Sequence, residues 1–213
     1  MCDSRLLLAA ALLVVAPLHA QSSVHAGVAS LAATHSRLDR LAGPVLQVTA
    51  GDPARRVRLL ASLERVAGAQ DVVRSPCGGM VRPGKDCTPV GFHDDGVITA
   101  GGLGPRVTLL RRTRAELAGF VMARVGVVKV TSAQLATAGG EPPRRSGESQ
   151  MLYGGDVGAC ASWQPFARLP VAIAASYSVG GYGALNAEQV LDAEQPLDRG
   201  IRFGRAQVGL TWR

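Results

Sequence analysis

The run Tyr153-Gly154-Gly155-Asp156-Val157-Gly158-Ala159-Cys160-Ala161-Ser162-Trp163 changes character from one residue to the next. Its odd positions are apolar, aromatic or glycine, and its even positions are polar or very small. Because side chains of a β-strand point alternately to opposite faces, this pattern predicts a strand with one apolar face. Residues 171–179 and 205–213 alternate in the same way, so both are also predicted to be strands.

Five earlier segments are compatible with strands, although their alternation is less regular. They are residues 24–34, 44–50, 57–64, 97–110 and 117–127. Segment 57–64 has a rival interpretation, because Asp52-Pro53 is a good N-cap and N1 pair and residues 54–67 could form a helix ahead of Gly68. The sequence therefore predicts eight strands, of which the third could instead be a helix.

The connections between these segments alternate in length. Those at 51–55, 111–114 and 164–170 are short, and those at 68–96, 132–150 and 185–200 are long; the first connection is an exception. A transmembrane barrel with both termini in the periplasm has short periplasmic turns and longer extracellular loops. The spacing thus favours an all-β fold, an eight-stranded antiparallel up-and-down transmembrane barrel, over a soluble sandwich.

Aromatic residues fit the dimensions of a membrane. Tyr153 and Trp163 share one face of a strand, about 33 Å apart at ~3.3 Å per residue, and tilt reduces this to about the 25 Å height of an apolar band. We expect Tyr153, Trp163 and Trp212 at the membrane interfaces. Four more rings fall near predicted strand ends: Phe166, Tyr177, Tyr182 and Phe203. The alternative is that these rings form the core of a secreted soluble barrel, since aromatics make up only 4% of the chain.

The N-terminal segment has the features of a secretory signal. Arg5 precedes the unbroken apolar run 6–18, and the small Ala20 stands before Gln21. That run is too short to span a ~30 Å hydrocarbon core as a helix. We expect residues 1–20 to be a cleaved signal peptide and residues 21–213 to form one barrel domain. With 213 residues, 47% hydrophobic, two full domains and a disordered chain are both disfavoured.

Export would leave three cysteines. Cys77 and Cys87 flank a Gly/Pro-rich stretch that can fold back on itself in an oxidising compartment, so a disulfide is expected between them. Two free thiols are the alternative, and the absence of zinc-type Cys/His spacing argues against a metal pair. Cys160 is expected to be a small packing residue.

The polar faces of the predicted strands carry charges of both signs. These would point into the barrel: Arg58, Glu64, Glu116, Arg124, Asp156 and Arg205. An eight-stranded barrel is only wide enough for side chains to fill it, and lone charges there would be costly. We therefore expect them to pair as a polar plug. A porin-like, narrow conduit for small solutes is the alternative.

Catalytic and nucleotide-binding patterns are weak. His93-Asp94-Asp95 places a base beside two carboxylates, but no nucleophile has a recognisable elbow, and the segment is more simply a turn before Gly96. His25 and His35 share a face without a visible carboxylate partner and are expected at an interface or in the lumen. We expect no enzyme, metal site or cofactor. The basic runs 111–114 and 144–145 are expected to meet anionic lipid head groups rather than nucleic acid.

Together with the eight alternating strands, the Gly-rich segments 101–105 and 154–159 and the closing run 207–213 resemble the small outer-membrane β-barrel proteins of diderm bacteria, the OmpA/OmpX/OmpW-like shape. The resemblance implies residence in the bacterial cell outer membrane, with its lipids, including lipopolysaccharide, and the barrel assembly machinery as partners. It also implies a structural or surface-interaction role, with any ligand unknown. A narrow channel and a soluble periplasmic barrel that binds an apolar ligand are the alternatives. One departure is that Arg213 follows Trp212, whereas such barrels usually end on an aromatic residue.

Overall fold

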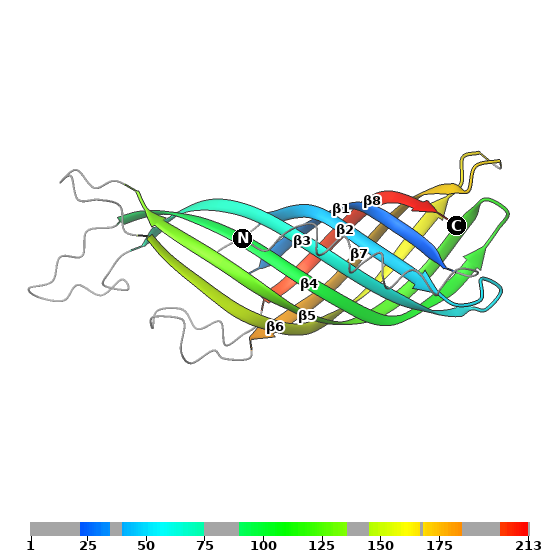
Figure 1. Cartoon of the computed structure of the whole chain (residues 1–213), viewed down its shortest axis with the longest axis horizontal. Coiled ribbons are helices and arrows are strands. Elements are labelled where there is room, and N and C mark those ends of the chain that lie inside the picture. The colour runs from blue at the N-terminus through cyan, green and yellow to red at the C-terminus, as the bar shows by residue number, and fades with distance from the viewer. Residues whose placement is uncertain are drawn as a thin grey trace, which may run out of the picture.

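The computed structural model describes residues 22–34, 40–74, 90–135, 145–166, 168–184 and 201–212. Within them, eight antiparallel strands form a closed barrel, in which each strand pairs with its chain neighbours and the last pairs with the first (Figure 1). The strands are β1 (Ser23–Thr34), β2 (Arg40–Ala50), β3 (Val57–Arg74), β4 (Val90–Arg111), β5 (Ala115–Gln134), β6 (Arg145–Trp163), β7 (Val171–Ala184) and β8 (Ile201–Trp212). None of the described residues forms a helix long and apolar enough to cross a membrane.

All eight predicted strands are present, and the predicted antiparallel barrel is confirmed. The helical alternative for residues 54–67 is wrong, because from Val57 onward this segment pairs with β4 along its whole length. Its alternation decides the outcome: Leu60, Ser62 and Glu64 are buried inside the barrel, and Leu59 is exposed on its outer face. A helix would have scattered these residues around its axis.

The central strands are longer than predicted. β3 runs to Arg74 and β4 begins at Val90, so much of the connection expected at 68–96 is strand. His93-Asp94-Asp95, expected to be a turn, therefore lies inside β4, and this expectation is wrong. The physical reason is that β3 and β4 keep pairing there, with Asp71 opposite His93, so their backbone groups remain satisfied.

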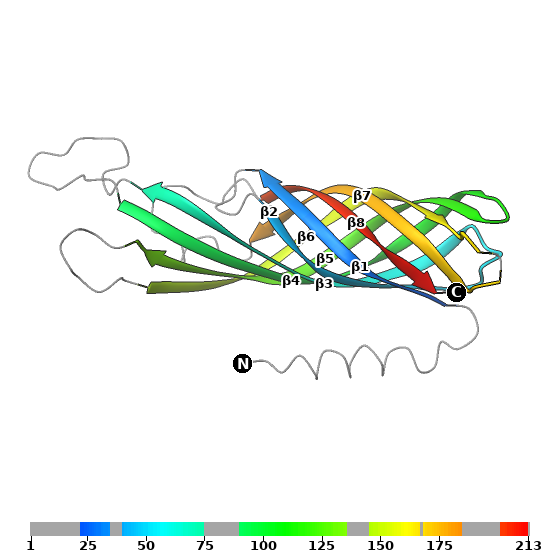
Figure 2. The same cartoon turned by 90° about the horizontal axis from the view of Figure 1, so that it is seen from above.

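The two ends of the barrel differ. The three described short turns and the C-terminal end of β8 lie at one end, called here the turn end, and β3 to β6 project at the other, called here the extended end (Figure 2). At the turn end, Gly51 adopts a φ of 120°, which residues with a Cβ rarely reach. The Asp52 carboxylate accepts the N–H of Ala54, which fixes the β2–β3 turn.

Candidate functional site

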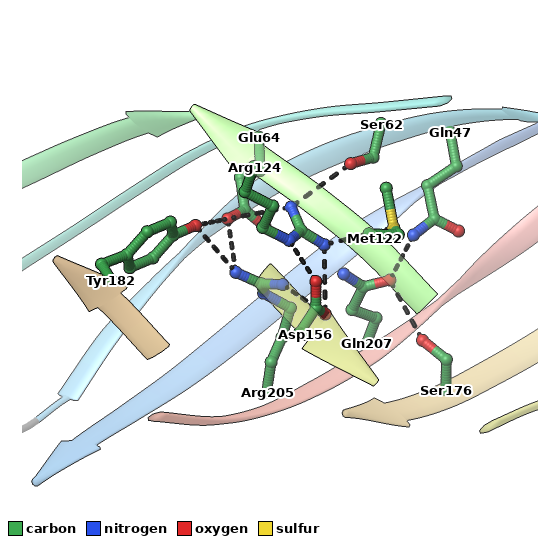
Figure 3. A network of polar contacts seen from close by, with 10 residues as sticks. All are labelled: Gln47, Ser62, Glu64, Met122, Arg124, Asp156, Ser176, Tyr182, Arg205 and Gln207. Carbon is green, nitrogen blue, oxygen red and sulfur yellow. Dashed lines mark hydrogen bonds and ion pairs between the residues drawn. The ribbon is translucent and has the colours of Figure 1, made fainter. Parts of the chain in front are cut away.

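A cluster of four charged side chains occupies the centre of the barrel (Figure 3). Glu64 of β3, Arg124 of β5, Asp156 of β6 and Arg205 of β8 are joined by four ion pairs. Arg124 Nε lies 2.6 Å from Asp156 Oδ1, and Arg205 Nη2 lies 2.7 Å from Glu64 Oε1. Two further contacts close the ring: Arg205 Nη1 to Asp156 Oδ2 at 3.0 Å and Arg124 Nη1 to Glu64 Oε1 at 3.5 Å. With two cations and two anions, this central cluster is formally neutral.

Small residues on the neighbouring strands make room for the central cluster. Gly102 lies opposite Arg124, and a Cβ at Gly102 would stand 2.7 Å from Met122 Cε and 3.2 Å from Arg124 Cγ. Gly180 lies opposite Asp156, and a Cβ there would approach Asp156 Cβ to 2.6 Å. Both approaches include a distance shorter than real Cβ atoms show. The glycines therefore allow long charged side chains to fill a barrel of only eight strands.

Uncharged polar groups extend this network. The Tyr182 hydroxyl donates to Glu64 Oε1 at 3.4 Å and accepts from Arg205 Nη2 at 3.3 Å. Nearer the turn end, Gln207 Oε1 accepts from Gln47 Nε2 at 2.8 Å and from Ser176 Oγ at 3.0 Å. The Tyr182–Glu64 bond crosses the lumen from β7 to β3, and Gln207 of β8 is bonded to β2 and to the neighbouring β7, so these bonds help to hold the cross-section of the barrel.

Apolar side chains fill the interior between the central cluster and the extended end. Buried residues there include Leu31, Leu41, Val66, Ile98 and Leu152. The rings of Tyr182 and Phe203 lie 4.9 Å apart, and the Arg205 guanidinium stands 4.6 Å above Phe203. The interior is thus filled by alternating apolar and polar layers.

A second charged group, called here the turn-end cluster, lies inside the barrel close to the short turns. Glu116 of β5 accepts from Arg58 of β3, from Arg106 Nη2 at 2.8 Å and from Arg111 Nη2 at 3.0 Å. Arg111 also donates to the carbonyl of Pro53, which ties the β2–β3 turn to the end of β4. Here three arginines surround one glutamate.

The structure places all six charged residues that the alternation assigned to the lumen inside the barrel, but in two clusters instead of one. Arg58 and Glu116 lie in the turn-end cluster, and the other four form the central cluster. Sequence reasoning missed Arg106, although its position between the outward-facing Pro105 and Val107 was a usable signal.

Aromatic residues divide between the two faces. Tyr153, Trp163 and Trp212 lie on the outer face with 49%, 55% and 43% of their surface exposed, and Phe166 and Tyr177 are exposed as well. Tyr182 and Phe203 lie near strand ends as expected, two residues from the end of β7 and from the start of β8, but both are buried in the interior. Their faces follow from parity, since Tyr182 shares its face with the inward Ser178.

The two histidines that the structure describes lie on opposite faces of the barrel wall. His93 faces outward, where its Nδ1–H donates to Asp71 at 2.5 Å, whereas Asp94 faces inward and accepts from Ser132 at 2.6 Å. The hydrogen bond with Asp71 raises the pKa of His93 above its ordinary value. His25 lies in the lumen, 3.1 Å from Thr211 Oγ1.

Several expectations concern other parts of the chain. The proposed signal peptide, His35, Cys77 and Cys87 lie outside the described residues. Cys160 is a free, partly buried cysteine. Across the ranges that the structure describes, no three His, Cys, Asp or Glu side chains are grouped so that they could hold a metal ion.

Known proteins share the fold. The sequence matches no protein-family model and no curated relative. A major outer membrane protein from Thermus thermophilus is similar in structure with a TM-score of 0.52 and 11% identity, over 89% of this chain and 98% of that chain. Ail of Yersinia pestis, solved in complex with the heparin analogue sucrose octasulfate, is similar with a TM-score of 0.47 and 14% identity, over 90% of this chain and 96% of that chain. Neisserial surface protein A is similar with a TM-score of 0.43 and 14% identity, again over 90% of this chain and 96% of that chain.

These identities are low, so the comparisons concern the fold alone. The chain has the closed eight-stranded antiparallel barrel fold, which the major outer membrane protein of Thermus thermophilus also matches over nearly its full length. The fold class expected from the alternation of residues is thereby confirmed.

Proposed function

We propose that the protein spans the bacterial outer membrane as a plugged barrel with a structural or surface-interaction role. The observation that carries this proposal is the reversed polarity of its two faces. Large apolar side chains are exposed around the outside, among them Val28, Val121, Val157 and Val208, each with more than half of its surface accessible. Soluble monomers rarely expose large contiguous apolar patches, whereas a barrel in lipid requires one.

Outward-facing charges support a definite depth in the membrane. Outward-facing charges gather in the projecting parts of β3, β4 and β5, namely Asp71, His93, Asp95 and Lys129. Arg65 of β3 also faces outward, at a level where β3 still pairs with β2. Charges facing lipid are unfavourable near the bilayer centre and tolerated at its edges. The extended end would therefore stand outside the bilayer on the cell surface, with the short turns in the periplasm. An exposed polar extension of this kind suits contact with a partner at the cell surface.

The filled interior favours a plug over a narrow channel. Arg124 and Arg205 lie across the centre of the lumen, with at most 1% of each side chain exposed. The apolar outer face and the charged interior also disfavour a soluble barrel that binds an apolar ligand, because such a barrel would need an apolar cavity and a polar outer face. A catalytic His93 would need a nucleophile on its own face of the sheet, but the hydroxyl of the nearby Ser132 lies on the opposite face. We therefore propose a protein without enzymatic activity. Outer-membrane lipids, including lipopolysaccharide, and the barrel assembly machinery are the partners that such a protein would require.

Two measurements test this function. Outer membranes would be isolated, and the protein's migration compared with and without boiling in detergent. We expect compact migration that shifts on boiling, and recovery in the soluble periplasmic fraction would contradict the membrane assignment. The purified barrel would then be added to planar bilayers, where we expect no steady conductance from the wild type. Regular conductance steps would favour the channel alternative.

A further inference from the structure

The turn-end cluster carries an excess of positive charge. Among the described residues, three arginines against one glutamate give this cluster a formal charge of +2, whereas the central cluster balances two against two. The side chains of Arg58 and Arg106 are mostly buried, with 9% and 13% of their surface exposed, so water screens the excess only in part.

Two of these arginines directly oppose each other. Arg58 of β3 and Arg106 of β4 are Cα partners in the sheet, and both donate to the same oxygen, Glu116 Oε1. Like charges directly opposite one another on neighbouring strands are destabilising. Glu116 alone therefore does not neutralise the pair.

Hydrogen-bond donors are also left over. Among the described residues, the buried Nε atoms of Arg58 and Arg106 have no hydrogen-bond partner. In the central cluster the buried atoms without a partner are Arg205 Nε and Glu64 Oε2, one donor and one acceptor. Of the two clusters that the structure describes, the turn-end cluster alone combines unused donors with an excess of positive charge.

The surroundings would draw anions to this end. Exposed arginines crowd the described parts of the short turns: Arg55, Arg56, Arg112, Arg114 and Arg168. The Asp52 carboxylate in these turns already accepts from Ala54 N–H. Arg111, with 38% of its side chain exposed, links the cluster to the solvent at the turn end. A concentration of one charge at the mouth of a narrow opening raises the local concentration of counter-ions.

We propose that the turn-end cluster is a binding site for a small oxyanion, such as phosphate, that enters from the periplasm. The guanidinium groups of Arg58 and Arg106 bind the anion through their Nε–H groups, which have no acceptor among the described residues. The partly exposed Arg111 lies between this site and the solvent. Planar guanidinium forks match the oxygens of phosphate and carboxylate groups. Calling this end periplasmic rests on the proposed function, whereas the site itself requires only the barrel.

The test measures phosphate binding to the refolded barrel in a non-ionic detergent that contains no phosphate. Binding would be followed by the 31P NMR line of inorganic phosphate and by the unfolding midpoint in phosphate against chloride at equal ionic strength. Arg106→Gln removes one guanidinium of the opposed pair, and Arg106→Lys keeps the charge but removes the Nε–H. Arg114→Gln, in an exposed turn, is the matched control.

We expect phosphate to raise the wild-type midpoint, and Arg106→Gln to weaken binding about tenfold, equivalent to about 1.4 kcal/mol. In chloride alone Arg106→Gln should be as stable as the wild type, because like-charge repulsion is relieved. Arg106→Lys should bind more weakly than the wild type, and Arg114→Gln should bind normally. Equal phosphate effects in all four proteins, or none in the wild type, would overturn the site.

Two controls separate this result from other outcomes. Each variant must run compact before boiling, which reports folding independently of phosphate. Phosphatidylglycerol added to the micelles presents the same phosphate group from outside the barrel. Stabilisation by this lipid but not by free phosphate would overturn a soluble-ion site and indicate a lipid contact instead. If fractionation found the protein outside the membrane, the proposed function would fail, but the measured binding of phosphate to the barrel would still hold.

Discussion

Arg124 and Asp156 form their 2.6 Å ion pair diagonally, since the Cα partner of Arg124 is Gly154 and that of Asp156 is Met122. The second oxygen of Asp156, Oδ2, accepts from Arg205 Nη1 at 3.0 Å and from Arg124 Nη2 at 3.4 Å. Each carboxylate of the central cluster thereby meets both arginines, and the ring of ion pairs closes without an excess charge.

Removing one member of this ring should destabilise the barrel. Asp156→Asn leaves two buried arginines against one glutamate, and breaking a buried pair in this way costs about 3–5 kcal/mol. The free energy of unfolding would be measured by urea titration in zwitterionic vesicles. Asp95→Asn, an exposed carboxylate on β4, is the control, and we expect a change within about 0.5 kcal/mol. Equal losses in both variants would mean that the ring contributes nothing specific.

An arginine on the outer face tests the depth of the barrel in lipid. Val157 is 53% exposed between Tyr153 and Trp163, so Val157→Arg should cost about 2–4 kcal/mol near the bilayer midplane. Thr131→Arg also faces outward, but in the projecting part of β5, where we expect little change. Urea midpoints in vesicles give the comparison. If both substitutions are equally mild, the outer face does not contact lipid.

The pair His93–Asp71 should make the extended end pH-sensitive. The pKa of His93 is raised in the folded protein, chiefly by its hydrogen bond with Asp71. Because the pKa is raised on folding, protonated His93 stabilises the folded protein. This stabilisation is fully present below the pKa of the unfolded chain, about 6.5, and is lost as the pH rises through the pKa of the folded protein. Amide protection of β3 and β4 near this pair should therefore be greater at low than at high pH.

An NMR titration of the His93 ring checks this directly. Asp71→Asn should lower the pKa of His93, and His93→Gln should abolish the pH dependence of amide protection. A wild-type His93 that titrates at or below its ordinary value would contradict the expectation.

The closing strand should matter more for assembly than the aromatic belt does. Trp212 pairs with Val24 of β1 and with Val171 of β7, so its strand completes the barrel. An unclosed edge has no partners for its N–H and C=O groups in hydrocarbon. We expect Trp212→Ala to lower the amount of heat-modifiable protein in isolated outer membranes more than Trp163→Ala does. Trp163 is the matched control, because it is also an exposed tryptophan at the turn end. Similar amounts for both variants would assign Trp212 only an anchoring role.

The disulfide between Cys77 and Cys87 remains a prediction. Alkylation of the unreduced protein followed by mass spectrometry should label Cys160 at most. Closing so short a loop stabilises by about 2–3 kcal/mol at most, and reduction should leave the strands folded. Labelling of all three cysteines would remove the prediction.

The pattern of apolar and polar residues was enough to place the strands and to assign their two faces. An alternation of period two assigns each side chain to one face, because successive residues of a strand point to opposite sides. Glu64, Arg124 and Asp156 could thus be assigned to the interior without coordinates. Strand lengths were less predictable: around His93 and Asp71 the outward-facing side chains are polar, so the alternation of apolar and polar residues disappears although the strands continue.

Which charged side chains meet depends on the geometry of the closed barrel. Glu64 and Arg205 are 141 positions apart, and their contact depends on how the closed barrel staggers β3 against β8. The alternation of residues gives the face on which a side chain lies. It gives neither the height of that side chain along the barrel axis nor which strand lies opposite it across the lumen. For the same reason, the gathering of Arg58 and Arg106 on Glu116 could not be read from spacing. It arises because pairing of β3, β4 and β5 brings the three to one level beside the short turns.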